Sequence, residues 1–93
     1  MLLVLDYDGT YTRDPLFWDA AIALCAQYKH DIIVATMRHE HEGAAVREDL
    51  GHLVKDILFT SRLAKHKHVY AAGYNPSVWI KKEAFASLHT PKR

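Results

Sequence analysis

The feature that most constrains the fold of this chain is an unbroken apolar run, residues 2–5 (LLVL), which stops abruptly at Asp6. Apolar and polar residues do not alternate in this run, a pattern typical of a strand buried on both faces of a parallel sheet. The polar segment DYDGT, residues 6–10, follows it directly. Because ligands of open parallel sheets bind at the carboxyl ends of the strands, this junction is the first candidate for a functional site.

Three more apolar segments are separated from this run, and from one another, by helical patterns. They predict strands at residues 32–35, 57–59 and 78–80, and the patterns between and after them predict helices at residues 15–28, 40–50, 62–72 and 83–88. Strands that alternate with helices indicate right-handed crossovers and a parallel sheet covered by helices. The sequence therefore predicts an α/β fold: a single Rossmann-like domain over residues 1–93, with three α/β/α layers and a mostly parallel sheet of about four strands.

The first predicted helix has clear start signals, with Asp14 as its N-cap and Pro15 at its first position. Trp18 lies off the apolar stripe of this helix and is predicted to be a surface contact, whereas Cys25 is predicted to be a small buried hydrophobe. The stripe itself recurs at helical spacing and is predicted to face the core; it consists of Leu16, Phe17, Ala20, Ala21, Leu24 and Tyr28.

The composition of the chain indicates in which cellular compartment we expect it and which classes of partner it can bind. Of its 93 residues, 49% are hydrophobic and 25% are charged, and the net charge is +1 with histidine neutral. This balance is ordinary for a globular domain and points to neither a membrane nor nucleic acid, although it leaves exposed phosphate ends open as partners. A single cysteine cannot form an internal disulfide, and the apolar start lacks the length and basic flank of a signal peptide. We therefore expect a cytoplasmic protein.

Polar side chains follow the predicted strands, and the carboxyl ends of parallel strands meet at one edge of a sheet. Asp6 and Asp8 follow the first strand, and Thr36 and Arg38 follow the second. Two carboxylates two residues apart suit phosphoryl transfer, because one can attack phosphorus while the other handles the proton of the leaving group. Gly9 permits the tight turn that this loop needs. The alternative is an ordinary turn with bystander acids.

These segments resemble the motifs of the haloacid dehalogenase (HAD) superfamily. Residues 6–10 (DYDGT) look like its first motif, and residues 33–36 (IVAT) look like its second, whose terminal Thr or Ser binds the phosphoryl group. The third motif supplies a lysine from a later helix; Lys65 fits this place, and Lys67 is the alternative. The resemblance implies a phosphohydrolase in which Asp6 is the nucleophile that forms an aspartyl-phosphate and Asp8 is the general acid and base.

Phosphate binding involves a second set of residues. The resemblance assigns it to Thr36 and Lys65, and Thr10 at the end of the first motif is a further candidate that can also brace its loop. Arg38, two residues beyond Thr36, is an additional candidate because of its charge, with a plain surface arginine as the alternative.

The fourth motif departs from the family pattern. Residues 75–80 (NPSVWI) match the lead-in of small HAD proteins without a cap module, of the kind that phages and bacteria encode, but Lys81 and Lys82 stand where the family has an acidic pair. In the family these acids help to hold Mg²⁺, for which Asp6 and Asp8 are the remaining ligands here. We expect Mg²⁺ binding to be weak, because Lys81 removes a ligand and adds a cation.

Two functions therefore stay open at the level of sequence. The first is a phosphomonoester hydrolase that is weak or inactive because of its altered fourth motif. The second is a non-catalytic protein of the same fold that binds or inhibits another protein, again of the phage-encoded kind. In the HAD superfamily, cap modules insert after the first motif or after the third strand, and residues 11–14 and 60–63 are too short to hold one. An uncapped site favours exposed phosphate ends and macromolecular phosphoesters as substrates, and it is equally consistent with a site no longer used for catalysis. Residues 39–42 (HEHE) lack the spacing of a two-histidine metal site and are predicted to be a solvated first helical turn.

Overall fold

The four-stranded parallel sheet expected from the sequence is present in the structure, a computed structural model that describes residues 1–80. Its strands are β1 (Leu2–Leu5), β2 (Asp31–Thr36), β3 (Asp56–Phe59) and β4 (Val78–Ile80). Their order across the sheet is β3-β2-β1-β4, and every neighbouring pair is parallel. The α/β fold class is therefore confirmed, with β1 inside the sheet. The helix expected over residues 83–88 lies outside the described residues, as do Lys81 and Lys82.

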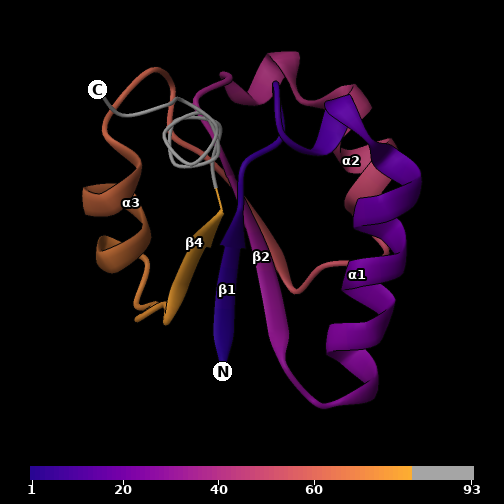
Figure 1. The fold of residues 1–93 in the computed structure, drawn as a ribbon. Coiled ribbons are helices and arrows are strands. Elements are labelled where there is room, and N and C mark those ends of the chain that lie inside the picture. Colours follow the sequence, from indigo (N-terminus) through magenta and orange to yellow (C-terminus); the bar gives the residue numbers. More distant parts are fainter. Residues whose placement is uncertain (81–93) are drawn as a thin grey trace, which may run out of the picture.

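Helices cover both faces of the sheet and give the three layers visible in Figure 1. α1 (Pro15–Gln27) and α2 (Ala44–Leu50) lie over one face, and α3 (Lys65–Ala71) lies over the other. Neighbouring residues of β2 enter different cores, because Val34 packs among residues of α1 and α2 whereas Ile33 packs with α3. This burial on two sides explains why the strand sequences are continuously apolar.

The inward face of α1 differs from the one that the sequence predicted. The helix packs on the core through Trp18, Ile22 and Cys25, so Trp18 is not the surface contact that its spacing suggested. α1 has apolar residues around most of its circumference and one charged residue, Asp19, so apolar spacing alone cannot define its inward face. Four residues of the expected stripe are instead largely exposed: Leu24 (55%), Phe17 (56%), Tyr28 (67%) and Leu16 (84%).

The second and third helices are shorter than predicted, and the backbone near their first turns gives the reason. Residues 40–50 form a single 3-10 turn (Glu40–Glu42) followed by α2, and the buried Gly43 stands at the break. The third helix begins at Lys65 because Ser61 (φ 54°) and Arg62 (φ 68°) adopt left-handed conformations that a right-handed helix does not contain.

We expect Gly43→Ala to lower the free energy of unfolding by about 1–3 kcal/mol, the usual cost of forcing an extra methyl group into a packed site. An added Cβ would lie 2.4 Å from the ring of Phe59 and 3.0 Å from the carbonyl oxygen of Glu40. Urea denaturation would measure the loss. Gly73→Ala is the comparison, because its Cβ meets nothing within 4 Å and costs only the strain of φ +95°. A Gly43→Ala protein as stable as the parent would contradict this account.

Candidate functional site

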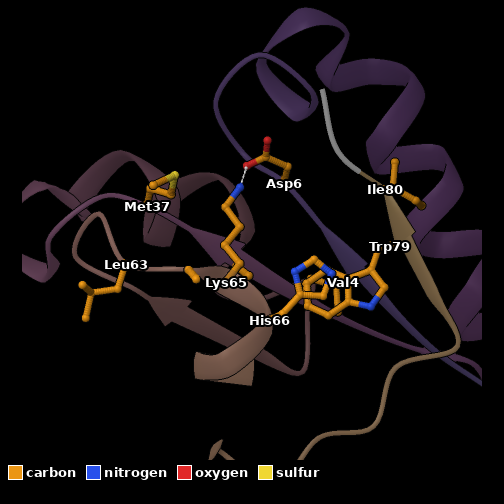
Figure 2. A pocket seen from close by; sticks show the side chains of 10 residues that line it. Val4, Asp6, Met37, Leu63, Lys65, His66, Trp79 and Ile80 are labelled. Carbon is orange, nitrogen blue, oxygen red and sulfur yellow. Dashed lines mark hydrogen bonds and ion pairs between the residues drawn. The ribbon is translucent and has the colours of Figure 1, made fainter. Parts of the chain in front are cut away.

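An ion pair between Asp6 and Lys65 lies at the carboxyl edge of the sheet. Asp6 follows the last residue of β1, and Lys65 is the first residue of α3, so the fold brings together groups 59 positions apart. Lys65 Nζ donates to Asp6 Oδ1 at 2.7 Å, and the two side chains are only 17% and 13% exposed. Figure 2 shows the lysine reaching across the hollow to the carboxylate. Of the two lysines considered from the sequence, Lys65 is the one at Asp6, whereas Lys67 is exposed on α3.

A second pair joins Asp8 to Arg38, which follows β2. Arg38 Nε and Nη2 each donate to one oxygen of Asp8 at 2.9 Å, so both carboxylate oxygens accept from the same guanidinium. Arg38 Nη1 also donates to the carbonyl oxygen of Glu42 at 2.9 Å, and the guanidinium lies 5.1 Å from the ring centroid of Tyr7. The hydrogen bonds from Arg38 hold the pKa of the Asp8 carboxyl below its ordinary value. Sequence spacing placed both residues at this edge and did not reveal that they pair.

The loop that carries Asp8 is braced by two tyrosines that the sequence analysis did not single out. Tyr7 Oη donates to Asp49 Oδ2 on α2, and Tyr11 Oη donates to Asp19 Oδ1 on α1, both at 2.7 Å. The two rings stack at 5.6 Å and are almost fully buried. Burial and the bond to Asp49 raise the pKa of Tyr7 to about 12. The visible signal was two aromatic residues four positions apart in an otherwise polar segment.

Gly9 and the candidate Thr10 lie in this same loop, and the candidate Thr36 is the last residue of β2. Gly9 has φ 80°, the left-handed conformation for which glycine is suited, and its N–H donates to Thr12 Oγ1 at 3.0 Å. The hydroxyl of Thr36 accepts from the N–H of Arg38 at 3.3 Å, and the residue is 1% exposed. The hydroxyl of Thr10 is buried and has no hydrogen-bond partner among residues 1–80. Neither threonine lines the hollow that holds Asp6 and Lys65.

That hollow has a volume of about 320 Å³ and opens beside the ends of β1 and β4. Asp6 and Lys65 form its polar end, and the backbone N–H of Asp6 donates to the carbonyl oxygen of Ile80 at 2.9 Å. Much of its remaining wall is apolar or aromatic, contributed by Met37, Leu63, His66 and Trp79 among others. The site therefore combines one shielded ion pair with an apolar wall.

The carboxylates do not fit a magnesium site in the arrangement seen. Mg²⁺ takes oxygen ligands in near-octahedral geometry, which requires carboxylate oxygens that face the ion. Both oxygens of Asp8 accept from Arg38, and Oδ1 of Asp6 accepts from Lys65. Within residues 1–80, no three side chains of the His, Cys, Asp or Glu types are grouped so that they could hold a metal ion. A metal ion bound by the side-chain oxygens of Asp8 would compete with Arg38 for them, so no step of the chemistry below depends on one.

Asp8→Asn is expected to lower the free energy of unfolding at pH 7 by less than about 1 kcal/mol, because the pair with Arg38 is partly exposed. The pKa of Asp8 is lower in the folded chain than its ordinary value of 3.8, so the contribution of the pair is present above pH 3.8 and disappears as pH falls through the folded value. Urea denaturation from pH 7 to pH 2 would therefore show the two proteins converging in acid. Arg38→Met should show the same pH-dependent part of the loss, with an additional part that does not change with pH because the variant also loses the hydrogen bond to Glu42. A difference between Asp8→Asn and the parent that stays constant to pH 2 would contradict the assignment.

None of the helices in the described part of the chain has the length and apolarity needed to cross a bilayer. Comparison with protein-family models, with curated proteins and with solved structures found no match to the chain.

Proposed function

We propose that this domain is a slow phosphomonoester hydrolase of HAD type that acts in the cytoplasm through Asp6. The observation that carries the proposal is the Asp6–Lys65 pair: a largely buried carboxylate at the end of a central strand, 2.7 Å from an ammonium group, beside an open hollow. A carboxylate in such a place can attack phosphorus, and the ammonium can neutralise the oxygens of the phosphoryl group as it arrives. The order of the sequence motifs supports the same assignment of roles.

The proposed reaction has two steps. In the first, an oxygen of Asp6 forms a bond to phosphorus while the bond from phosphorus to the leaving oxygen breaks, and protonated Asp8 gives its proton to that oxygen. In the second, a water oxygen attacks the same phosphorus, the bond to Asp6 breaks, and ionised Asp8 takes the proton of the water. Inorganic phosphate leaves, and both carboxyl groups return to their starting states.

Slow turnover follows from the Asp8–Arg38 pair. With its ordinary pKa of 3.8 the Asp8 carboxyl is already ionised at neutral pH, and Arg38 lowers this pKa further, so the protonated form that can donate to a leaving group becomes still rarer. The bidentate bond also holds Asp8 in a position from which it must be released to act. The absence of acidic residues at positions 81 and 82 supports weak dependence on Mg²⁺.

The same pairs favour a second candidate, a non-catalytic binding protein that retains the fold. Each of the two carboxylates is neutralised by a cation of its own chain, which stabilises the loop without any substrate.

Hydrolysis of 4-nitrophenyl phosphate by the purified protein, with and without 5 mM Mg²⁺, separates the candidates. The hydrolase proposal expects slow release of nitrophenol that Mg²⁺ changes little. No release above that of a buffer blank would favour the binding protein.

Lys81→Asp combined with Lys82→Asp tests the altered fourth motif through stability. If these positions correspond to the acidic pair of HAD proteins, the double variant gains carboxylate ligands and binds Mg²⁺ in the folded state. A site with Kd near 1 mM would raise the free energy of unfolding by about 1.4 kcal/mol at 10 mM Mg²⁺. The parent protein, and Lys81→Ala combined with Lys82→Ala, should show little such gain. Equal responses of all three proteins would show that these lysines are not at the metal position.

A further inference from the structure

The wall of the hollow beside Asp6 is built from aromatic and flexible apolar side chains. The His66 ring stacks on Trp79 with centroids 4.2 Å apart and planes inclined by 26°. Met37 and Leu63, from the segments after β2 and β3, also line the hollow and are 43% and 63% exposed. Figure 2 shows the His66–Trp79 stack on one side of Lys65 and the two aliphatic side chains on the other. An exposed apolar wall of this kind suits an apolar ligand.

Leu63 is held at this wall by a strained backbone. Ser61 and Arg62 precede it with φ of 54° and 68°, conformations that cost residues other than glycine about 1 kcal/mol or more each. The segment stays in place because the N–H of Arg62 donates to the carbonyl oxygen of Met37 at 2.7 Å, and because the guanidinium of Arg62 pairs with Glu42 at 3.2 Å. The fold thus maintains strain and leaves a leucine 63% exposed beside the reactive pair, which burial in the core does not explain.

Resting on the proposed function, we infer that the substrate is an aryl phosphomonoester, in which an aromatic ring is bonded directly to the ester oxygen. The His66–Trp79 stack and Leu63 line the same hollow as Asp6, so a ring bonded directly to the ester oxygen can contact this wall while the phosphoryl group lies at Asp6. A volume of about 320 Å³ accommodates a phosphoryl group and one ring, and lies at the lower end of the range for ligand pockets. Leu63, Met37 and His66 are then the residues that select the leaving group.

Binding of phosphonates tests this inference without the confounding difference in reactivity between aryl and alkyl esters. Phenylphosphonate and methylphosphonate carry the same headgroup and cannot be hydrolysed, and calorimetry gives their Kd values. We expect the parent protein to bind phenylphosphonate at least 10-fold more tightly. Leu63→Ala and His66→Ala should each reduce this ratio to less than about 3-fold and leave the Kd of methylphosphonate unchanged. Leu24→Ala, which removes an exposed leucine of α1, is the matched control and should keep the full ratio.

The outcomes separate this inference from the proposal on which it rests. Equal affinity of the two phosphonates would overturn the aryl preference and leave the phosphoryl site intact. A preference that survives both Leu63→Ala and His66→Ala would also overturn it, because the ring would then bind elsewhere. Failure of the folded parent protein to bind either phosphonate would contradict the phosphoryl site itself. Loss of both ligands in Lys65→Met, with the parent binding normally, would support the site at Asp6 and Lys65.

Discussion

Asp6→Asn is expected to reduce the hydrolysis of 4-nitrophenyl phosphate by about 1000-fold or more, the scale of loss seen when a covalent nucleophile is removed. The amide of asparagine is uncharged and cannot form the acyl-phosphate, although its oxygen can still accept a hydrogen bond from Lys65. The substitution therefore removes the chemistry and keeps the shape of the site. A thermal unfolding measurement first shows that the variant is folded. The turnover number of the variant is then compared with that of the parent protein.

Asp31→Asn is a suitable control for that experiment. Asp31 is also an aspartate in an ion pair, with Lys55 at 3.3 Å, but its side chain is 58% exposed and lies at the opposite end of β2 from the site. Its replacement should leave turnover unchanged. If Asp6→Asn retained the activity of the parent, hydrolysis would not proceed through Asp6, and the activity would have to be assigned to another site or to a contaminant.

Lys65→Met is expected to lower the free energy of unfolding by about 3 kcal/mol, the lower end of the cost of breaking a buried ion pair. The variant leaves the Asp6 carboxylate, which is 13% exposed, without the cation that neutralises it. Lys55→Met breaks an exposed pair of the same type, with side chains 52% and 58% exposed, and should cost less than about 1 kcal/mol. Urea denaturation at pH 7 measures both variants under the same conditions.

A double-mutant cycle shows whether the loss in Lys65→Met comes from the pair itself. In Asp6→Asn combined with Lys65→Met no charge is left unpaired, so the combined cost should be smaller than the sum of the two single costs by 1 kcal/mol or more, roughly the coupling typical of groups in direct contact. Additive costs would mean that Asp6 and Lys65 do not interact in solution. Equal losses in Lys65→Met and Lys55→Met would mean that water screens the pair at Asp6.

Local sequence was sufficient to define the strands of the sheet and the edge at which the candidate site lies. The apolar runs at residues 2–5 and 32–35 are continuous because both faces of those strands are buried, and this pattern is visible without any knowledge of partners. The signals at Asp14 and Pro15 placed the start of α1 correctly, and Asp14 Oδ1 accepts from the N–H of Phe17 at 3.3 Å. Such features depend on neighbouring residues only, so a sequence carries them in full.

Features that depend on residues far apart in the chain could not be obtained in this way. The sequence contained two apolar faces on α1, and packing on Ile22 rather than on Leu24 was decided by the sheet beneath the helix. Likewise, Asp8 and Arg38 were each predicted to be site residues, yet their bidentate pair depends on how the first loop meets the end of β2. The order of the motifs placed Lys65 near Asp6. The distance between the ammonium and the carboxylate, and the low exposure of both side chains, depend on where α3 begins.

The sequence by itself determined which chemical groups stand at the carboxyl edge of the sheet, because the ends of the strands follow from local patterns. Only the tertiary structure decided which of these groups neutralise one another and which wall surrounds them. The strained turn at Ser61 and Arg62, which directly precedes Leu63 at the wall of the hollow, has no local signal, since neither residue favours a left-handed conformation on its own. Its conformation is maintained by contacts with the segment after β2, and such contacts exist only once the chain has folded.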